Sequence, residues 1–197
     1  MERADCKNVP THKLRLGTEI HVPRSVHRVR ADSPAIAVMT DLQQVTAATV
    51  TPEISLAQVT QIMINKGVRL LLVTEKAAGL VGLITARDTM GERPIKLLKD
   101  NGGKHADLLV RDLMIPAAQI DVIDYADVLQ AEVGHIIATL KHFGRQHALV
   151  VDIDALTGEE MLRGIFSATQ IGRQLGIPLQ PFEVARTFAE IEAALAA

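Results

Sequence analysis

The amino-acid sequence predicts a mixed α/β (α+β) protein built from two similar β-α-β-β-α halves, followed by a C-terminal helix. The first reason is an internal repeat, because short motifs of the first half return in the same order in the second. The second reason is the spacing of apolar residues, which changes along each half between the runs of buried strands and the period of a helix. Apolar residues make up 48% of the 197 residues and tryptophan is absent, so we expect an aliphatic core.

Three pairs of motifs define the repeat: Met39 and Met114, the runs that start at Gly67 and Gly144, and Gly82-Leu83-Ile84-Thr85 and Gly164-Ile165-Phe166-Ser167. Their offsets are 75, 77 and 82 residues. Offsets that grow in small steps indicate a few residues added in a helix and in a hairpin of the second half. The order of elements is therefore expected to be the same in both halves.

In the first half, the predicted elements are a strand at Val45–Val50, a helix from Leu56 to Gly67, strands at Leu70–Thr74 and Leu80–Thr85, and a helix from near Ala86. Ser55 is a favoured N-cap for the first helix, and Gly67 is a favoured C-terminal stop. The continuous apolar run Leu70–Thr74 is typical of a strand that is buried on both faces.

In the second half, the predicted elements are a strand at Ile120–Ile123, a longer helix at roughly Val128–His142, strands at Ala148–Asp152 and Met161–Phe166, and a helix from near Ala168. Residues 92–111 are interpreted as a helix plus linker between the halves, because they contain a Gly-Gly pair. After two prolines, Phe182–Leu195 has the apolar spacing of an amphipathic helix.

The predicted organisation has five parts: a basic N-terminal arm (1–33), a first repeat (34–100), a linker (101–111), a second repeat (112–176) and a C-terminal amphipathic helix (177–197). A repeat of about 60–70 residues buries too little surface to be secure alone, so we expect the two to pack sheet against sheet. The arm carries seven Lys or Arg against four Asp or Glu, hence +3, which leaves −5 for the rest. Such an arm could contact an anionic partner, but it is typical of a solvated terminal segment.

The net charge of −2 argues against a nucleic-acid-binding protein that relies on overall charge. Cys6 is the only cysteine, which excludes a disulfide within one chain and fits a reducing, cytoplasmic location. The sequence lacks a secretory signal and an apolar run of membrane-spanning length, so we expect a soluble protein with no membrane partner. Four of the seven histidines lie in the arm or the linker, His147 is alone on a strand, and His135 and His142 have no carboxylate or cysteine partner at ligand spacing. Neither a metal site nor a required cofactor is therefore predicted.

Catalytic residues are not predicted either. Ser167 has no evident His–acid pair, and Cys6 lies in the terminal arm. Nothing in the sequence assembles a nucleophile with a base and an oxyanion site. We therefore expect that the protein is not an enzyme.

The most informative segment is Gly82-Leu83-Ile84-Thr85-Ala86-Arg87-Asp88, in which a predicted strand ends at Thr85 and a helix starts immediately. The hydroxyl and the free N–H groups of such a helix start attract phosphate oxygens. Asp88, three residues on, can accept hydrogen bonds from a ribose diol, so one turn could hold the sugar and phosphate of a nucleotide. The same Thr-x-x-Asp spacing is also a capping box with a purely structural role, and this alternative stays open.

The position of the motif favours the nucleotide interpretation, because it closes a β-α-β-β-α unit that then recurs. This arrangement resembles the CBS repeat, named after cystathionine β-synthase, over roughly residues 36–176, and Val38-Met39-Thr40 resembles the common opening of that family. The resemblance implies a Bateman module, in which two repeats related by a pseudo-twofold axis form two clefts. Such clefts often bind AMP, ADP or ATP, and sometimes S-adenosylmethionine or a dinucleotide such as NAD. It also implies a homodimer.

The nucleotide-binding residues that the resemblance implies for the better cleft are Thr85, Arg87, Asp88, Val122, Gln146, His147 and Ala148. Thr85 would contact the phosphate or ribose and Asp88 the ribose hydroxyls, and Val122 and Ala148 would flank the adenine. A side chain that faces solvent is the alternative for Arg87. Gln146 and His147 occupy positions at which members of the family present basic groups to phosphates. A neutral, hydrogen-bonded ring is the alternative for His147.

The second cleft departs from the family pattern. Ser167 keeps the hydroxyl, but Gln170 stands where the ribose carboxylate is expected. An amide lacks the stronger charged hydrogen bond to a hydroxyl. Arg69 from the first repeat could supply charge for a phosphate there. We expect one strong site and a weaker or unused second one.

These observations predict a non-catalytic regulatory module that binds an adenine nucleotide between its repeats. It would act as a nucleotide or energy sensor in signal transduction for an unidentified regulated protein. The alternative is a ligand-free structural or dimerisation module that interacts with a partner protein. Binding of nucleic acid through the basic arm is a third hypothesis, which the scarcity of aromatic residues disfavours.

Overall fold

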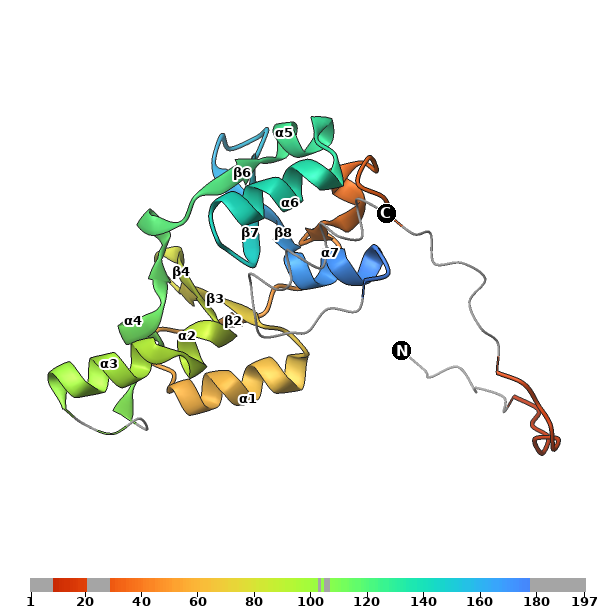
Figure 1. The fold of residues 1–197 in the computed structure, drawn as a ribbon, viewed down its shortest axis with the longest axis horizontal. Coiled ribbons are helices and arrows are strands. Elements are labelled where there is room, and N and C mark those ends of the chain that lie inside the picture. The colour runs from red at the N-terminus through yellow and green to blue at the C-terminus, as the bar shows by residue number, and fades with distance from the viewer. Residues whose placement is uncertain (1–8, 21–28, 103, 105–106, 178–197) are drawn as a thin grey trace, which may run out of the picture.

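The computed structural model describes residues 9–20, 29–102, 104 and 107–177. In this part of the chain, two halves each contain a four-stranded sheet with helices beside it (Figure 1). The first half is yellow to green in Figure 1, and the second is teal to blue. This is the mixed α/β architecture that the sequence predicts. The helix predicted at Phe182–Leu195 and most of the basic stretch at 21–30 lie outside the described residues.

The sheet of the first half has, in spatial order, the strands β2 (Thr49–Val50), β3 (Leu70–Glu75), β4 (Gly79–Thr85) and β5 (Ile115–Pro116). β2 and β3 are parallel, and the other two neighbouring pairs are antiparallel. The helices of this half are α1 (Leu56–Lys66), α2 (Ala86–Met90), α3 (Glu92–Asn101) and α4 (Val110–Leu113).

The sheet of the second half has, in spatial order, the strands β1 (Thr40–Asp41), β8 (Glu160–Ser167), β7 (His147–Ile153) and β6 (Val122–Asp124). β6 and β7 are parallel, and the other neighbouring pairs are antiparallel. The helical segments are η1 (Ala35–Val38), η3 (Ala117–Gln119), α5 (Tyr125–Gln130), α6 (Val133–His142) and α7 (Ala168–Gln174).

Each sheet takes one edge strand from the segment that leads into the other half. β1 precedes the strands of the first half in sequence, yet it pairs with β8, where Thr40 lies opposite Ile165. β5 precedes the strands of the second half, yet it pairs with β4, where Ile115 lies opposite Leu83. The two folding units are therefore interleaved in sequence, and each is completed by residues on the far side of a repeat boundary.

An ion pair connects β1 to β8 in the sheet of the second half. The Asp41 carboxylate pairs with the guanidinium of Arg163 on β8. That guanidinium also lies over the ring of Tyr125, 4.7 Å from the centroid. The hydrogen bond from Arg163 holds the pKa of Asp41 below its ordinary value.

The capping signals in the sequence place α1 correctly. Ser55 Oγ accepts a hydrogen bond from the Gln58 N–H at 3.4 Å, and Gln58 Oε1 accepts one from the Ser55 N–H at 3.2 Å. Gly67 ends the helix with φ 64°, a left-handed conformation that glycine adopts without steric penalty. The predicted buried strand is confirmed as well, because the first four residues of β3 are buried.

The single helix predicted at roughly Val128–His142 is wrong. The chain forms α5 and α6 instead, with a break at residues 131–132. At the break, the Ala131 carbonyl accepts a hydrogen bond from the Ala35 N–H, and the Val133 N–H donates to the Ser33 carbonyl, both at 2.9 Å. Pairing with the segment that enters the first repeat thus takes up backbone groups that a continuous helix would use.

The opening strands also differ from their predicted bounds. β2 covers only the end of the predicted Val45–Val50 strand. β6 begins two residues later than the predicted Ile120–Ile123 strand, because Ile120 ends a helical turn by donating its N–H to the Ala117 carbonyl at 3.0 Å.

The two sheets share a core, as the size of each repeat predicts. Leu70, Leu72 and Leu83 of the first sheet and Leu149 of the second are buried in one cluster. Each half also has its own cluster between sheet and helices. Among the described residues, none of the helices has the length and apolar character needed to cross a bilayer.

Candidate functional site

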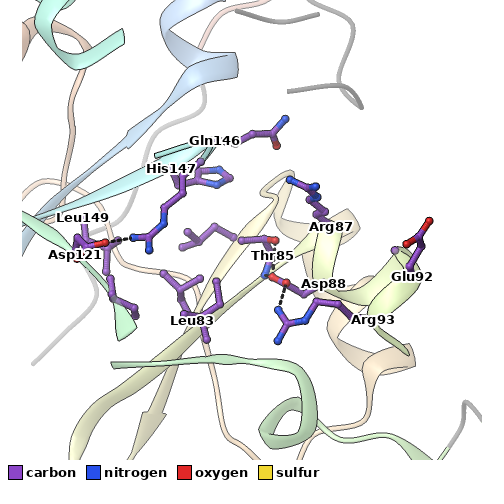
Figure 2. Close-up of a pocket in the computed structure, with 16 residues that line it drawn as sticks. Leu83, Thr85, Arg87, Asp88, Glu92, Arg93, Asp121, Gln146, His147 and Leu149 are labelled. Atoms are coloured by element: carbon purple, nitrogen blue, oxygen red, sulfur yellow. Dashed lines mark hydrogen bonds and ion pairs between the residues drawn. The ribbon is translucent and has the colours of Figure 1, made fainter. Parts of the chain in front are cut away.

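A cavity of about 640 Å³ lies where the two halves meet (Figure 2). The first half contributes the start of β3, the end of β4, and residues of α2 and α3. The second half contributes the start of β7 and the loop before it. The apolar part of the lining consists of Leu70, Leu83, Ile115, Ile120 and Leu149. The volume lies within the range of sites that enclose a small organic ligand.

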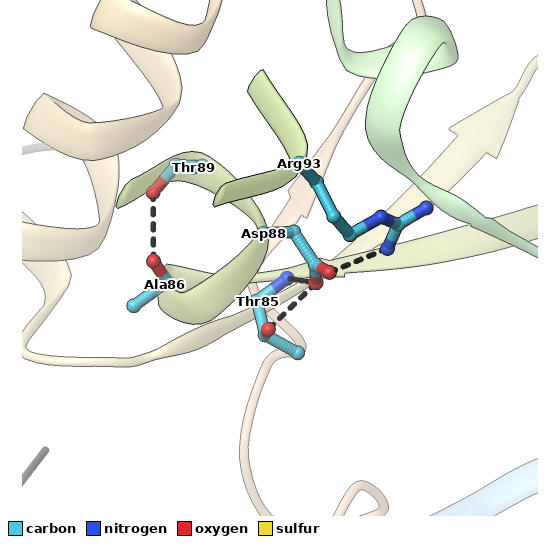
Figure 3. Close-up of polar contacts among 5 residues, drawn as sticks. All are labelled: Thr85, Ala86, Asp88, Thr89 and Arg93. Carbon is cyan, nitrogen blue, oxygen red and sulfur yellow. Dashed lines mark hydrogen bonds and ion pairs between the residues drawn. The ribbon is translucent and has the colours of Figure 1, made fainter. Parts of the chain in front are cut away.

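The start of α2 presents Thr85 and Asp88 to this cavity. Asp88 Oδ2 accepts a hydrogen bond from the Thr85 N–H at 2.9 Å and a second from the Thr85 hydroxyl at 2.6 Å (Figure 3). Asp88 is only 6% exposed. The carboxylate therefore accepts the hydrogen bond of the free Thr85 N–H at the helix start, and it also lines the cavity.

Arg93 holds the other carboxylate oxygen. Its Nη1 donates to Asp88 Oδ1 at 2.7 Å, so that Asp88 has partners on both oxygens (Figure 3). The Arg93 side chain is 54% exposed. A half-exposed guanidinium on a flexible stem can change partner far more easily than the buried carboxylate can move.

Three arginines line the cavity: Arg87, Arg93 and Arg145. Arg145 comes from the loop before β7, and its Nη1 lies 3.0 Å from Asp121 Oδ2. Its guanidinium also lies 5.8 Å from the centroid of the Phe143 ring. Two of the three cations thus have a carboxylate partner within the lining, and all three can reorient toward an anionic group.

His147 lines the cavity from the start of β7. Burial and, as the smaller cause, the positive charge of Arg69 together lower the pKa of His147 to about 4. The imidazole is therefore neutral at pH 7. This favours the neutral ring over the basic phosphate ligand, although its N–H still offers one donor.

The structure brings five of the seven expected nucleotide-binding residues to this cavity: Thr85, Arg87, Asp88, Gln146 and His147. Val122 and Ala148 are not part of its lining. Val122 pairs with Leu149 on the neighbouring strand, and of these two partners it is Leu149 that lines the cavity.

Sequence reasoning missed Arg93, Asp121 and Arg145. Arg93 lies five residues after Asp88, outside the Thr-x-x-Asp motif, and the other two lie in loops beside strands. The available signal was their position, because Asp121 directly precedes Val122, an expected adenine contact, and Arg145 follows Gly144, which opens a repeated run.

The equivalent polar positions of the second half are arranged differently. Gln170 Oε1 accepts a hydrogen bond from the Thr40 hydroxyl at 3.1 Å, and Arg69 donates to the Thr169 hydroxyl. Ser167 is the N-cap of α7. Burial lowers the pKa of Arg69, as does the nearby charge of Arg173. Of the residues expected in the weaker cleft, Gln170 and Arg69 are thus engaged with groups of the protein.

Groups of three or more His, Cys, Asp or Glu side chains that could hold a metal ion are not found among the residues that the structure describes.

Comparisons with known proteins agree with this architecture. Residues 33–93 match the family model described as CBS domain. No curated protein matches the sequence. Among solved structures, an uncharacterized conserved protein from Pyrococcus horikoshii is similar, with 18% identity and a TM-score of 0.53 over 78% of this chain and 99% of that chain.

Two further similar structures are of one protein. CBSX2 in complex with AMP has 22% identity and a TM-score of 0.50, over 72% of this chain and 94% of that chain. The CBS-pair protein CBSX2 from Arabidopsis thaliana has 22% identity and a TM-score of 0.47, over 72% of this chain and 92% of that chain. Residues 33–93 thus match the CBS-domain family, and the chain shares its fold with these solved structures.

Proposed function

We propose that this protein is a non-catalytic regulatory module that binds an adenine nucleotide in the cavity between its repeats and acts as a nucleotide sensor. The observation that carries the proposal is the combination of lining groups in one cavity of about 640 Å³. Apolar side chains on both sheets suit a planar base, a carboxylate at a helix start suits a ribose diol, and three arginines suit phosphates.

The placement of these groups supports one bound pose. Leu83 and Leu149 come from opposite sheets and both belong to the apolar part of the lining, which would face the base. Thr85 and Asp88 lie beside this apolar part, at the end of β4. Arg87 and Arg93 lie on the same side as Asp88, within the lining. Base, ribose and phosphate would thus follow one another along the cavity.

The similar structure of CBSX2 in complex with AMP supports an adenine nucleotide as the ligand class. Because that likeness is one of fold, the choice of ligand for this chain rests on its own lining residues. AMP, ADP and ATP share the base and the ribose and differ only in the number of phosphates. A sensor of this kind would favour the conformation of the module that binds the nucleotide better, and would present it to a regulated protein.

The hydrogen bonds of Asp88 favour a second candidate function. Its carboxylate already has Thr85 and Arg93 as partners, which is what a purely structural cap requires. On this alternative, the module is a ligand-free scaffold that forms a dimer or contacts a partner protein. The two functions differ in one measurable property, namely whether an adenine ligand stabilises the fold.

A thermal-unfolding screen with AMP, ADP, ATP, S-adenosylmethionine and NAD tests the proposal. A ligand at 100 times its dissociation constant should stabilise the fold by about 2.7 kcal/mol, hence raise Tm by roughly 5–10 °C for a chain of this size. Asp88→Ala should abolish this shift. If none of the five ligands raises the Tm of the wild-type protein, the sensor function is wrong and the scaffold is favoured.

A further inference from the structure

Arg93 donates a hydrogen bond to the Asp88 carboxylate, which is also the group that the hydroxyls of a bound ribose would need. A carboxylate offers about four lone-pair positions. Three are used in the structure, two by Thr85 and one by Arg93. A ribose diol has two hydroxyls to place, so one existing donor has to leave Asp88 before both hydroxyls can bind it.

The donor that can exchange Asp88 for a group of the ligand is Arg93, since the Thr85 hydroxyl belongs to a short side chain at the strand end. The Thr85 N–H is fixed by the backbone where β4 ends and α2 begins. The Arg93 guanidinium is half-exposed and ends a long flexible side chain. It also lies at the wall of the same cavity, so after release it remains beside the ligand.

The released guanidinium requires a new anion close by. Of the other carboxylates that line the cavity, Asp121 pairs with Arg145, and the Glu92 carboxylate points away from Arg93 and Asp88 (Figure 2). A phosphate on the same nucleotide can receive the fork of Arg93 donors, since guanidinium and phosphate form strong bidentate hydrogen bonds. A nucleoside without a phosphate offers no such group, and an adenosyl sulfonium has a positive charge at the 5′ position, where a nucleotide carries its phosphate.

We propose that Arg93 makes this cavity selective for phosphorylated adenine nucleotides over neutral or cationic adenosyl compounds. Arg93 exchanges Asp88 for the phosphate when the ribose hydroxyls take its place on the carboxylate. This inference rests on the proposed nucleotide site and adds to it the class of ligand and the residue that selects it.

Isothermal titration calorimetry at pH 7.5 with AMP, adenosine and S-adenosylmethionine tests the proposal. The wild-type protein is expected to bind AMP at least about tenfold more tightly than adenosine, the factor expected for one hydrogen bond to a charged group. S-adenosylmethionine is expected to bind no better than adenosine.

Arg93→Gln is the decisive variant, because glutamine keeps an amide donor and removes the charge. This variant should bind AMP about tenfold more weakly than the wild-type protein does. Its affinity for adenosine should be unchanged or slightly higher, since Asp88 then gives up a weaker hydrogen-bond partner. Arg93→Lys should restore part of the preference for AMP. Lys96→Gln removes one positive charge from an exposed position of the same helix, outside the cavity lining, and should change neither affinity.

Three outcomes would overturn the inference, and they can be told apart from failure of the proposed function. Equal affinity of the wild-type protein for AMP and adenosine would show that the phosphate is not selected. An equal loss of both affinities in Arg93→Gln would make Arg93 a structural support of Asp88. An equal loss of AMP affinity in Lys96→Gln would assign the effect to overall charge. If the wild-type protein binds none of the three compounds, the proposed nucleotide site itself is wrong.

Discussion

The main chain of Ile115 passes so close to Gly82 that a Cβ atom at position 82 would lie 2.5 Å from the Ile115 carbonyl oxygen. This contact is the place where β5 joins the sheet of the first half. In the second half, the Met39 side chain packs against Gly164 where β1 joins β8. The glycine of each Gly-h-h-[Thr/Ser] motif thus makes room for the segment that enters from the other repeat.

Gly82→Ala is expected to destabilise the fold by about 1–3 kcal/mol, because the added methyl group meets backbone that cannot move without breaking the β4–β5 pairing. Urea unfolding would measure the change. Gly164→Ala is the matched comparison, and its effect should be smaller because the neighbour is the flexible side chain of Met39. Equal stability of the wild-type protein and Gly82→Ala would refute the close packing of β5 on β4.

Asp88→Ala is expected to lower the free energy of unfolding by about 1–2 kcal/mol even without a ligand, since the cap of α2 and the partner of the Thr85 N–H are lost together. Asp88→Asn keeps an acceptor oxygen, so its free energy of unfolding should fall by less. Chemical unfolding of the three proteins would show this order. If Asp88→Ala is as stable as the wild-type protein, the hydrogen bonds from Thr85 do not contribute to folding.

His147 is expected to make stability depend on pH. Its pKa is about 4 in the folded protein against an ordinary value of 6.5, so between these values the unfolded chain binds more protons than the folded one. Stability is therefore complete above pH 6.5 and falls as the pH drops toward 4. The expected loss between pH 7.5 and pH 5 is about 1–2 kcal/mol.

Urea unfolding at pH 7.5, 6 and 5 measures this dependence, and His147→Gln should flatten it. His12→Gln is the matched control, because His12 is exposed in the N-terminal arm. A pH dependence that is the same in His147→Gln and the wild-type protein would assign the effect to other groups.

Local chemistry accounts for the parts of the fold that could be predicted. Ser55 and Gly67 mark the ends of α1 because capping depends on residues a few positions apart. The break between α5 and α6 could not be predicted in this way. It depends on backbone pairing of residues 31–35 with residues 131–134, about a hundred positions away in the sequence. The exchange of β1 and β5 between the halves has the same long-range origin.

The residues of the candidate site also fall into those that local sequence predicts and those that it does not. Thr85 and Asp88 are predictable because a strand end, a helix start and a fixed spacing bring them together. Arg93 reaches the cavity from α3 and pairs with Asp88, five residues earlier but outside the motif spacing. Arg145 reaches it from a loop and pairs with Asp121, which the fold brings beside it. Val122 was expected at the adenine, but it pairs with Leu149, which lines the cavity in its place.

The central claim is that one adenine nucleotide binds per chain, in the cavity between the repeats. Calorimetric titration of AMP into the wild-type protein, Asp88→Ala and Gln170→Ala tests it most directly, because positions 88 and 170 are equivalent in the two repeats. We predict one AMP per chain for the wild-type protein and Gln170→Ala, and no measurable binding for Asp88→Ala. Absence of binding to the wild-type protein, or loss of binding in Gln170→Ala alone, would contradict the account.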